Sequence, residues 1–367
     1  MYGRTQYLSL RKTHNEPLQQ TALRRHKGGV RQGEPPPRSN PDVTEARQTS
    51  GSKGERRMTG RLEPIRGVMA PILTPFNADL TIAHDLFADH AHHLITSGCA
   101  GLAPFGTTGE ALSLGIEERI VALERLLDRG IDAKQLIPGT GLTNLPDTIR
   151  LTRHAVDRGC AGAMVLPPFY FKNVPDEGLF TYFASLIESV ASDALRIYLY
   201  HIPPVAQVGF SVELIQRLRS AFPAQIVGIK DSSGDWGNTQ RLLTEVSGLL
   251  VYPGSELPLL EALSLGAPGC ITATANINAP SIAEIISLHR SGQKAEAKQR
   301  HEIVKKLRLK IQEFGPIPAQ KYLLSMWSGD ERWRHVRPPL LSLPDAVGRQ
   351  LNSTLEREFA FAPSSRA

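Results

Sequence analysis

The stretch Ile226-Val227-Gly228-Ile229-Lys230-Asp231-Ser232-Ser233 begins with apolar residues and ends with charged and hydroxyl-bearing ones. Its apolar part does not alternate with polar residues, which is typical of a strand covered on both faces in a parallel sheet. Similar short apolar runs recur along the chain and end in Gly, Pro, Thr or Ser. The predicted strands span residues 67–76, 100–106, 135–141, 162–168, 196–203, 226–233, 249–256 and 269–276.

Amphipathic stretches of helical period lie between these runs, at residues 116–129, 145–157, 177–190 and 212–221. Strands that alternate with helices indicate right-handed crossovers and a parallel sheet. Eight repeats fit a closed barrel better than an open sheet. The first run also ends in Thr74-Pro75-Phe76, not in the Gly-rich turn usual after the first strand of an open sheet. The sequence therefore predicts an α/β fold, a (β/α)8 TIM barrel.

The net charge of +6 is concentrated in the first residues. Residues 1–60 hold 12 Lys and Arg against 5 Asp and Glu, which leaves the rest of the chain at −1. We therefore expect no nucleic-acid partner for the globular part. The first segment is rich in Gly, Pro, Ser, Gln and Arg, and we predict a disordered basic extension over residues 1–62. It is interpreted as an extension upstream of a true start at Met58, as an organelle transit peptide, or as a functional basic arm.

The predicted domains are the extension at residues 1–62, a catalytic barrel at 63–280 and a C-terminal helical region at 281–367. Helices are expected at residues 280–290 and 294–314. No apolar run approaches the roughly 20 residues that cross a bilayer, so no membrane span is predicted. The cysteines, Cys99, Cys160 and Cys270, lack CxxC spacing and are interpreted as reduced structural thiols. A cytoplasmic location is expected, or an organellar one if residues 1–57 are a transit peptide.

Lys230 is the candidate nucleophile, because active sites of such barrels lie at the carboxyl ends of the strands. A lysine at the end of a buried strand loses water, which favours the neutral amine, and a neutral amine attacks a ketone to form a Schiff base. The alternative is a lysine that reaches out to solvent or pairs with Asp231.

Other strand ends add further candidates. Tyr170 and Tyr200 are placed to move protons, although a tyrosine at a strand end often only packs. Thr107 and Thr108 lie in a Gly-rich turn that either holds a carboxylate or simply caps a helix. His90, His92 and His93 cluster on a predicted helix, away from the strand ends, and are interpreted as a packed or solvated face. We expect no metal site and no cofactor, since no nucleotide-binding fingerprint is present.

The motifs Gly106-Thr107-Thr108-Gly109-Glu110, Tyr200-x-x-Pro203 and Gly228-x-Lys230-Asp231-Ser232-Ser233-Gly234 resemble those of the dihydrodipicolinate synthase / N-acetylneuraminate lyase family. The resemblance extends from about residue 66 to 345. It implies a Schiff base on Lys230 with pyruvate or its equivalent, and Tyr200 as general acid and base. It also implies that Thr107 relays protons, that Thr108 binds the carboxylate, and that groups near Gly254 and Ile271 line the pocket.

The resemblance further implies a homotetramer, a dimer of dimers, in which Tyr170 reaches into the site of a neighbouring subunit. Family members that make dihydrodipicolinate usually carry an arginine five residues after the catalytic tyrosine, and this chain has Val205 there. Phe169 stands where a second tyrosine is expected beside Tyr170. Valine forms no bidentate contact with a carboxylate. The pattern therefore favours an aldolase or lyase acting on a 2-oxo acid and an aldehyde, such as a 2-oxo-3-deoxy sugar acid or 4-hydroxy-2-oxo acid aldolase.

Two alternatives stand beside this prediction. In the first, the protein is 4-hydroxy-tetrahydrodipicolinate (dihydrodipicolinate) synthase, with Arg196 or a partner subunit's residue holding the second carboxylate. His201 and Gln207 are further candidates for polar contacts to the second substrate, or are structural. In the other, a catalytically silent barrel acts as a binding module. Lys230, Tyr200 and Thr107 together disfavour a silent barrel, because a binding module needs no desolvated lysine.

Overall fold

The computed structural model describes residues 64–361. The predictions for the extension at residues 1–62 and for residues 362–367 lie outside the described residues. Within residues 64–361, seven strands form two parallel sheets, with the orders β2-β1-β7 and β3-β4-β5-β6. The strands are β1 (Gly67–Ala70), β2 (Gly101–Leu102), β3 (Ala163–Val165), β4 (Ile197–His201), β5 (Ile226–Asp231), β6 (Leu250–Pro253) and β7 (Gly269–Ile271).

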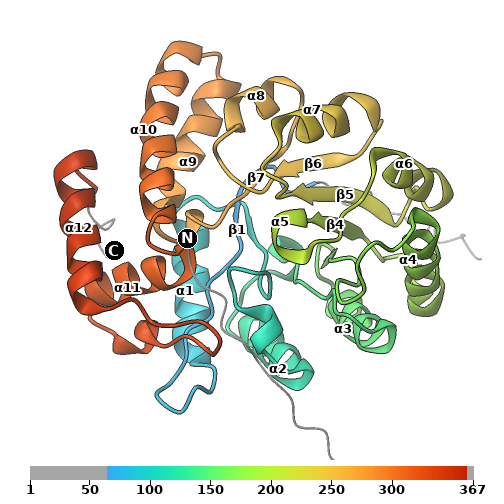
Figure 1. Ribbon diagram of the computed structural model, residues 1–367, viewed down its shortest axis with the longest axis horizontal. Coiled ribbons are helices and arrows are strands. Elements are labelled where there is room, and N and C mark those ends of the chain that lie inside the picture. The colour runs from blue at the N-terminus through green and yellow to red at the C-terminus, as the bar shows by residue number, and fades with distance from the viewer. Residues whose placement is uncertain (1–63, 362–367) are drawn as a thin grey trace, which may run out of the picture. The chain divides into compact units, whose positions relative to one another are not determined.

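The segment at residues 136–139 joins the two sheets and occupies the place of the third predicted strand. Ile137 N–H donates to the carbonyl of Leu102 at 2.9 Å, and Met164 N–H donates to that of Pro138 at 2.8 Å. Across the remaining gap, β6 and β7 lie side by side. The eight segments close into the predicted (β/α)8 barrel, with the strands inside and helices around them (Figure 1).

Within the described residues, eight helices follow the barrel segments in turn. They are α1 (His84–Thr96), α2 (Ile116–Asp128), α3 (Leu145–Asp157), α4 (Asp176–Val190), α6 (Val212–Ala221), α7 (Trp236–Glu245), α8 (Leu259–Ser264) and α9 (Ala275–Arg290). Short turns add α5 (Pro203–Ala206), η1 (Ala111–Ser113), η2 (Ala133–Gln135) and η3 (Glu331–Arg334). The predicted helices at 145–157 and 212–221 are confirmed residue for residue.

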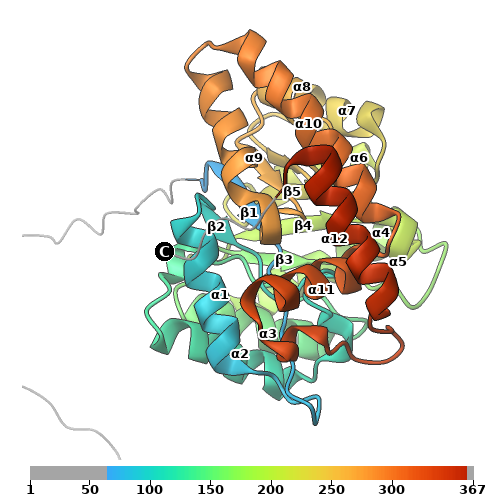
Figure 2. The same cartoon turned by 90° about the vertical axis from the view of Figure 1, so that its left-hand side faces the viewer.

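Three more helices, α10 (Lys294–Gln312), α11 (Pro316–Ser328) and α12 (Asp345–Phe359), gather on one side of the barrel beside α9 (Figure 2). The domain boundary predicted at residue 280 falls inside α9, near a kink at Asn278 (φ −138°, ψ 28°). The turn before Pro280 is also helical, so α9 begins earlier than the sequence predicts. In the described part of the chain, no helix is long and apolar enough to span a bilayer.

The strands are buried on both faces, as their continuous apolar runs predict. Along β4, Ile197 and Leu199 point outward to the layer of helices, whereas Tyr198 and Tyr200 point into the barrel. This alternation follows from the two-residue period of a strand. It decides which side chains at the strand ends face the barrel interior.

The cysteines Cys99, Cys160 and Cys270 are free and buried, in agreement with their interpretation as structural thiols. Burial raises the pKa of Cys99 and Cys160 to about 12. A thiol with so high a pKa carries almost no thiolate at neutral pH and is therefore a poor nucleophile.

A buried ion pair ties the C-terminal helices to the turn after β2. The ammonium group of Lys321, in α11, contacts one carboxylate oxygen of Glu110, and the other accepts the N–H of Arg337 at 2.8 Å. Lys321 also donates to the carbonyl of His335 at 2.8 Å. Burial lowers the pKa of Lys321 to about 8, an effect that Glu110 opposes. Removing either partner would leave the other as an unpaired buried charge, which destabilises the fold.

Lys321→Ala should therefore lower the free energy of unfolding by about 3–5 kcal/mol. Urea denaturation measures this loss. Lys310→Ala is the matched control, because Lys310 pairs with Glu313 at the surface and such pairs contribute at most about 1 kcal/mol. Equal losses in the two variants would contradict a structural role for the buried pair.

Candidate active site

A cavity of about 790 Å³ opens at the carboxyl ends of the strands. Thr107, Thr108, Tyr200, Lys230 and Gly254 line it from the loops and ends of the barrel strands. The C-terminal helices supply the opposite wall, with Arg308 and Gln312 from α10 and Ile317 from α11. We call this space the lysine cavity. It lies where an α/β barrel carries its active site.

Lys230 is the central side chain of the lysine cavity and is only 3% exposed. Its β5 position pairs in register with Tyr200 of β4. The Nζ atom donates to the Tyr200 hydroxyl at 3.5 Å and lies 4.5 Å from the centre of the tyrosine ring. The Tyr200 hydroxyl in turn lies 3.1 Å from Oγ1 of Thr107. The three groups form a continuous chain along which a proton can move.

Asp231 does not pair with Lys230, because successive residues of a strand point to opposite faces. Its carboxylate instead accepts hydrogen bonds from Thr239 Oγ1 at 2.6 Å and from Asn238 Nδ2 at 3.1 Å. Within residues 64–361, no carboxylate forms a salt bridge with Lys230. Its ammonium group is thus neither exposed to solvent nor paired with a counter-charge.

The turn at residues 106–109 presents donors to the lysine cavity. Thr107 is exposed within it and Thr108 is buried at its wall. In the described part of the chain, the backbone N–H groups of Thr107 and Thr108 have no acceptor. The turn is held from behind by Glu110, which has a left-handed backbone (φ 55°) and is fixed by Lys321. Free N–H groups in such a turn suit a carboxylate.

Sequence reasoning missed Arg308, which α10 brings into the wall. The Nη1 atom of Arg308 lies 3.4 Å from Oε2 of Glu256. The Glu256 carboxylate is fully buried and also accepts hydrogen bonds from the hydroxyls of Thr272 and Thr274. Helical spacing was the signal that could have identified Arg308, because it lies on the same buried stripe of α10 as Val304 and Ile311. A charged residue on such an apolar stripe usually has a buried partner.

Two predicted site residues lie outside the wall of the lysine cavity. Ile271 is fully buried among apolar side chains of the barrel interior, whereas Ala273, two residues further on, lines the cavity. Tyr170 is 73% exposed and packs edge to face against Phe171, with 5.4 Å between ring centres. The structure brings Lys230, Tyr200, Thr107, Thr108 and Gly254 together, and leaves Tyr170 outside the site of its own chain.

The clustered histidines His90, His92 and His93 do not line the lysine cavity. His90 is buried on α1, where its Nε2 atom lies 3.1 Å from Oδ1 of Asn276. Its ring also packs edge to face on Trp333 at 4.8 Å. Burial lowers the pKa of His90 to about 4, so the neutral ring packs as part of the core.

Comparison with known proteins now identifies the family. The model of the dihydrodipicolinate synthetase family matches residues 64–358. An uncharacterised DapA-like lyase of Chloroflexus aurantiacus is 34% identical over 80% of this chain and 97% of its own. The chain belongs to the dihydrodipicolinate synthetase family. It is therefore related to aldolases and lyases that act on small molecules.

Solved structures of this family show the same fold. The crystal structure of dihydrodipicolinate synthase from Agrobacterium tumefaciens superimposes with a TM-score of 0.73 at 33% identity, over 80% of this chain and 99% of that one. A variant of the Sulfolobus solfataricus 2-keto-3-deoxygluconate aldolase has a TM-score of 0.73 at 26% identity, over 80% of this chain and 96% of that one. Synthase and aldolase thus share the fold, which leaves the choice between their reactions to the residues around Lys230.

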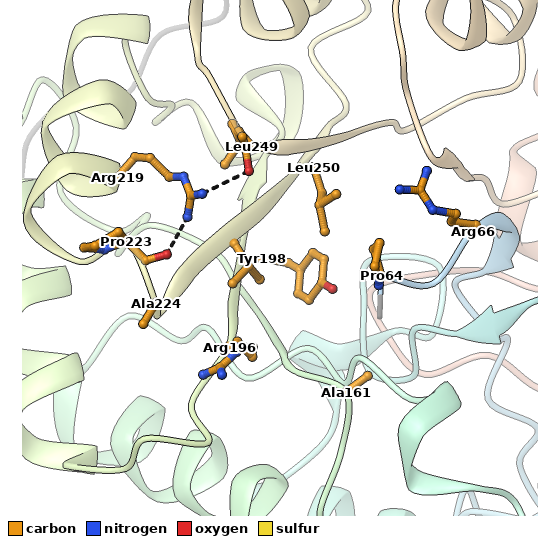
Figure 3. Close-up of a pocket in the computed structure, with 12 residues that line it drawn as sticks. Pro64, Arg66, Ala161, Arg196, Tyr198, Arg219, Pro223, Ala224, Leu249 and Leu250 are labelled. Carbon is orange, nitrogen blue, oxygen red and sulfur yellow. Dashed lines mark hydrogen bonds between the residues drawn. The ribbon is translucent and has the colours of Figure 1, made fainter. Parts of the chain in front are cut away.

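Arg196, the residue of this chain considered for a second carboxylate, does not line the lysine cavity. Arg196 precedes β4, about 13 Å along the strand from Tyr200. It lines a different hollow of about 690 Å³ with Arg66 and Arg219 (Figure 3). This position contradicts the alternative in which Arg196 holds the second carboxylate.

The other two polar candidates also lie outside the wall of this cavity. His201 accepts the N–H of Phe210 at Nδ1, 3.0 Å away, which fits the structural interpretation. Gln207 is exposed at the end of α5. Val205 does line the cavity, at 62% exposure, so the side chain that replaces the arginine faces the site.

Gly254 is required by close packing at the cavity wall. A Cβ atom at this position would lie 2.0 Å from Oγ and 2.8 Å from Cβ of Ser232. Gly254→Ala should therefore lower the free energy of unfolding by about 1–3 kcal/mol, because overpacking forces neighbours to move. Gly178→Ala is the matched control, since the new methyl group would meet atoms no closer than 3.9 Å. Urea midpoints that do not differ between the two variants would refute this packing constraint.

Proposed function

We propose that the protein is a lysine Schiff-base aldolase or lyase that forms or cleaves a carbon–carbon bond next to pyruvate or a related 2-oxo acid. The observation that supports this most strongly is the chain from Lys230 through the Tyr200 hydroxyl to Thr107. A buried amine without a counter-ion, within reach of a proton carrier, suits attack on a ketone.

In the proposed mechanism, the carboxylate of the 2-oxo acid binds the free N–H groups of Thr107 and Thr108. The amine of Lys230 then attacks the C2 carbonyl. Tyr200 protonates the hydroxyl of the resulting carbinolamine, which leaves as water and gives the imine. Loss of a proton from C3 gives the enamine, which is the nucleophile of the aldol step. Tyr200 is placed for both proton transfers, and Thr107 relays the proton onward.

For the second substrate, we propose an aldehyde that lacks a carboxylate at the position faced by Val205. The reaction is then the formation or cleavage of a 2-oxo-3-deoxy sugar acid or another 4-hydroxy-2-oxo acid. The alternative, 4-hydroxy-tetrahydrodipicolinate synthase, requires a cation for a second carboxylate. In the described part of the chain, Arg308 is the arginine that lines the lysine cavity, and its Nη1 atom is shared by Glu256 and Thr272.

We also propose that the protein assembles as a homotetramer in which Tyr170 completes the site of a neighbouring subunit. Tyr170 and Phe171 are each 73% exposed, and such adjoining aromatic side chains are typical of a contact surface. This placement explains why Tyr170 lies outside the cavity of its own chain.

Pyruvate followed by borohydride should attach a reduced three-carbon group to Lys230, as read by peptide mass spectrometry. Lys321 is an internal control: it is equally buried, but its ammonium group is paired with Glu110. Lys230→Met should remain unlabelled. Labelling of Lys321, or of surface lysines at the same level, would exclude the proposed mechanism.

Tyr200→Phe should slow Schiff-base formation by about 10²–10⁴-fold without loss of stability, since only the proton-carrying hydroxyl is removed. The rate is measured by quenching pyruvate mixtures with borohydride at successive times. Tyr198→Phe, two residues earlier on the same strand, should react at the unaltered rate. Similar rates for both variants would remove Tyr200 from the proton path.

A further inference from the structure

A second hollow, of about 340 Å³, adjoins the lysine cavity, and we call it the side pocket. Thr107, Tyr200, Ile202, Val205 and Ile317 line both spaces. The two spaces therefore adjoin along these side chains, one of which, Tyr200, also contacts Lys230. A molecule joined to Lys230 can extend past Tyr200 into the side pocket.

The side pocket is walled mainly by apolar side chains from distant parts of the sequence. Met164, Leu166 and Phe169 come from β3 and the loop after it, and Leu340 comes from the segment between η3 and α12. Phe169 stands where the family resemblance implies a tyrosine, so this position contributes no hydroxyl to the wall.

Within the described part of the chain, most polar side chains in the same wall are already occupied, and the hydroxyl of Ser113 is the exception. Glu110 is the charged residue that lines the side pocket within the described part of the chain, and its two oxygens are taken by Lys321 and the N–H of Arg337. The hydroxyls of Thr107 and Tyr200 lie within hydrogen-bond distance of each other. A ligand with several hydroxyl groups would lose hydrogen bonds to water there and gain few in return. The lysine cavity differs, because Ser232, Ser255 and Gln312 are among the polar residues that line it.

We propose that the side pocket binds an apolar group on C4 of a 4-hydroxy-2-oxo acid, so that the aldehyde substrate carries an aliphatic or aromatic chain. This inference rests on the function proposed above and narrows its substrate to one class. In the synthetic direction, C3 of the enamine forms a bond to the aldehyde carbon, and the aldehyde oxygen takes a proton from Tyr200 to become the C4 hydroxyl. Water then hydrolyses the imine, which releases the product and the amine of Lys230. Cleavage follows the reverse steps.

The volume and lining of the side pocket support this class of substrate. Pockets that bind small molecules are mostly apolar and measure roughly 300–1,000 Å³. Burying one methylene group favours binding by about 0.8 kcal/mol, which corresponds to roughly four-fold. The value of kcat/KM should therefore rise about four-fold per carbon from acetaldehyde to pentanal. Glyceraldehyde should react at least about ten-fold less well than butanal, because its hydroxyls lose water without replacement.

The test measures condensation of pyruvate with these aldehydes, by chromatography of the products, on the full-length protein. Leu340→Asn should reduce the preference for butanal over glyceraldehyde by about ten-fold or more. Leu341→Asn is the matched control, since Leu341 is 83% exposed and is not part of the side pocket wall. Val205→Arg should shift the preference towards succinic semialdehyde, which carries a carboxylate.

Borohydride trapping of pyruvate is measured in the same preparations. A protein that traps pyruvate on Lys230 but uses glyceraldehyde as well as butanal would overturn this inference and leave the proposed function intact. Chain-length independence, as expected if a second copy of the chain fills the side pocket, would overturn it too. Absence of trapping would instead refute the proposed function itself.

Discussion

The pairing of Lys230 with Tyr200 across β4 and β5 is the contact on which the site depends. Both residues lie on the inward face of the barrel, so the two-residue period of a strand fixes which side chains meet. The same period turns Asp231 outward to Thr239 and Asn238, which leaves the lysine without a counter-charge. A shift of β5 by one residue would exchange Lys230 and Asp231 and remove the site.

The C-terminal helices complete the site as well as the fold. Glu110 and Lys321 join α11 to the turn that carries Thr107 and Thr108, and α10 adds Arg308 to the wall. The barrel strands and this helical layer therefore enclose the lysine cavity together. The side pocket lies at the same junction, because Leu340 and Ile317 come from the C-terminal region and Met164 from a strand.

The barrel and the residues at its strand ends could be predicted from the sequence, since apolar runs report burial on both faces and the polar residue that ends each run marks the rim. Arg308, Lys321 and Leu340 could not be assigned to the site, because they approach it from helices and loops remote from any strand end. Arg196 was considered for the site because it is close to Tyr200 in sequence. The length of β4 nevertheless separates the two residues along the barrel axis. Within one strand, the number of residues between two positions fixes the distance between them. Between a strand and the helices packed around it, separation in sequence says little about distance in space.

The most direct test of the Schiff-base mechanism is a crystal structure of the protein soaked with pyruvate. Continuous density should run from Nζ of Lys230 to C2 of pyruvate, with the carboxylate on the N–H groups of Thr107 and Thr108 and the Tyr200 hydroxyl beside the new bond. Pyruvate bound without a bond to Lys230, or with its carboxylate held away from that turn, would contradict it.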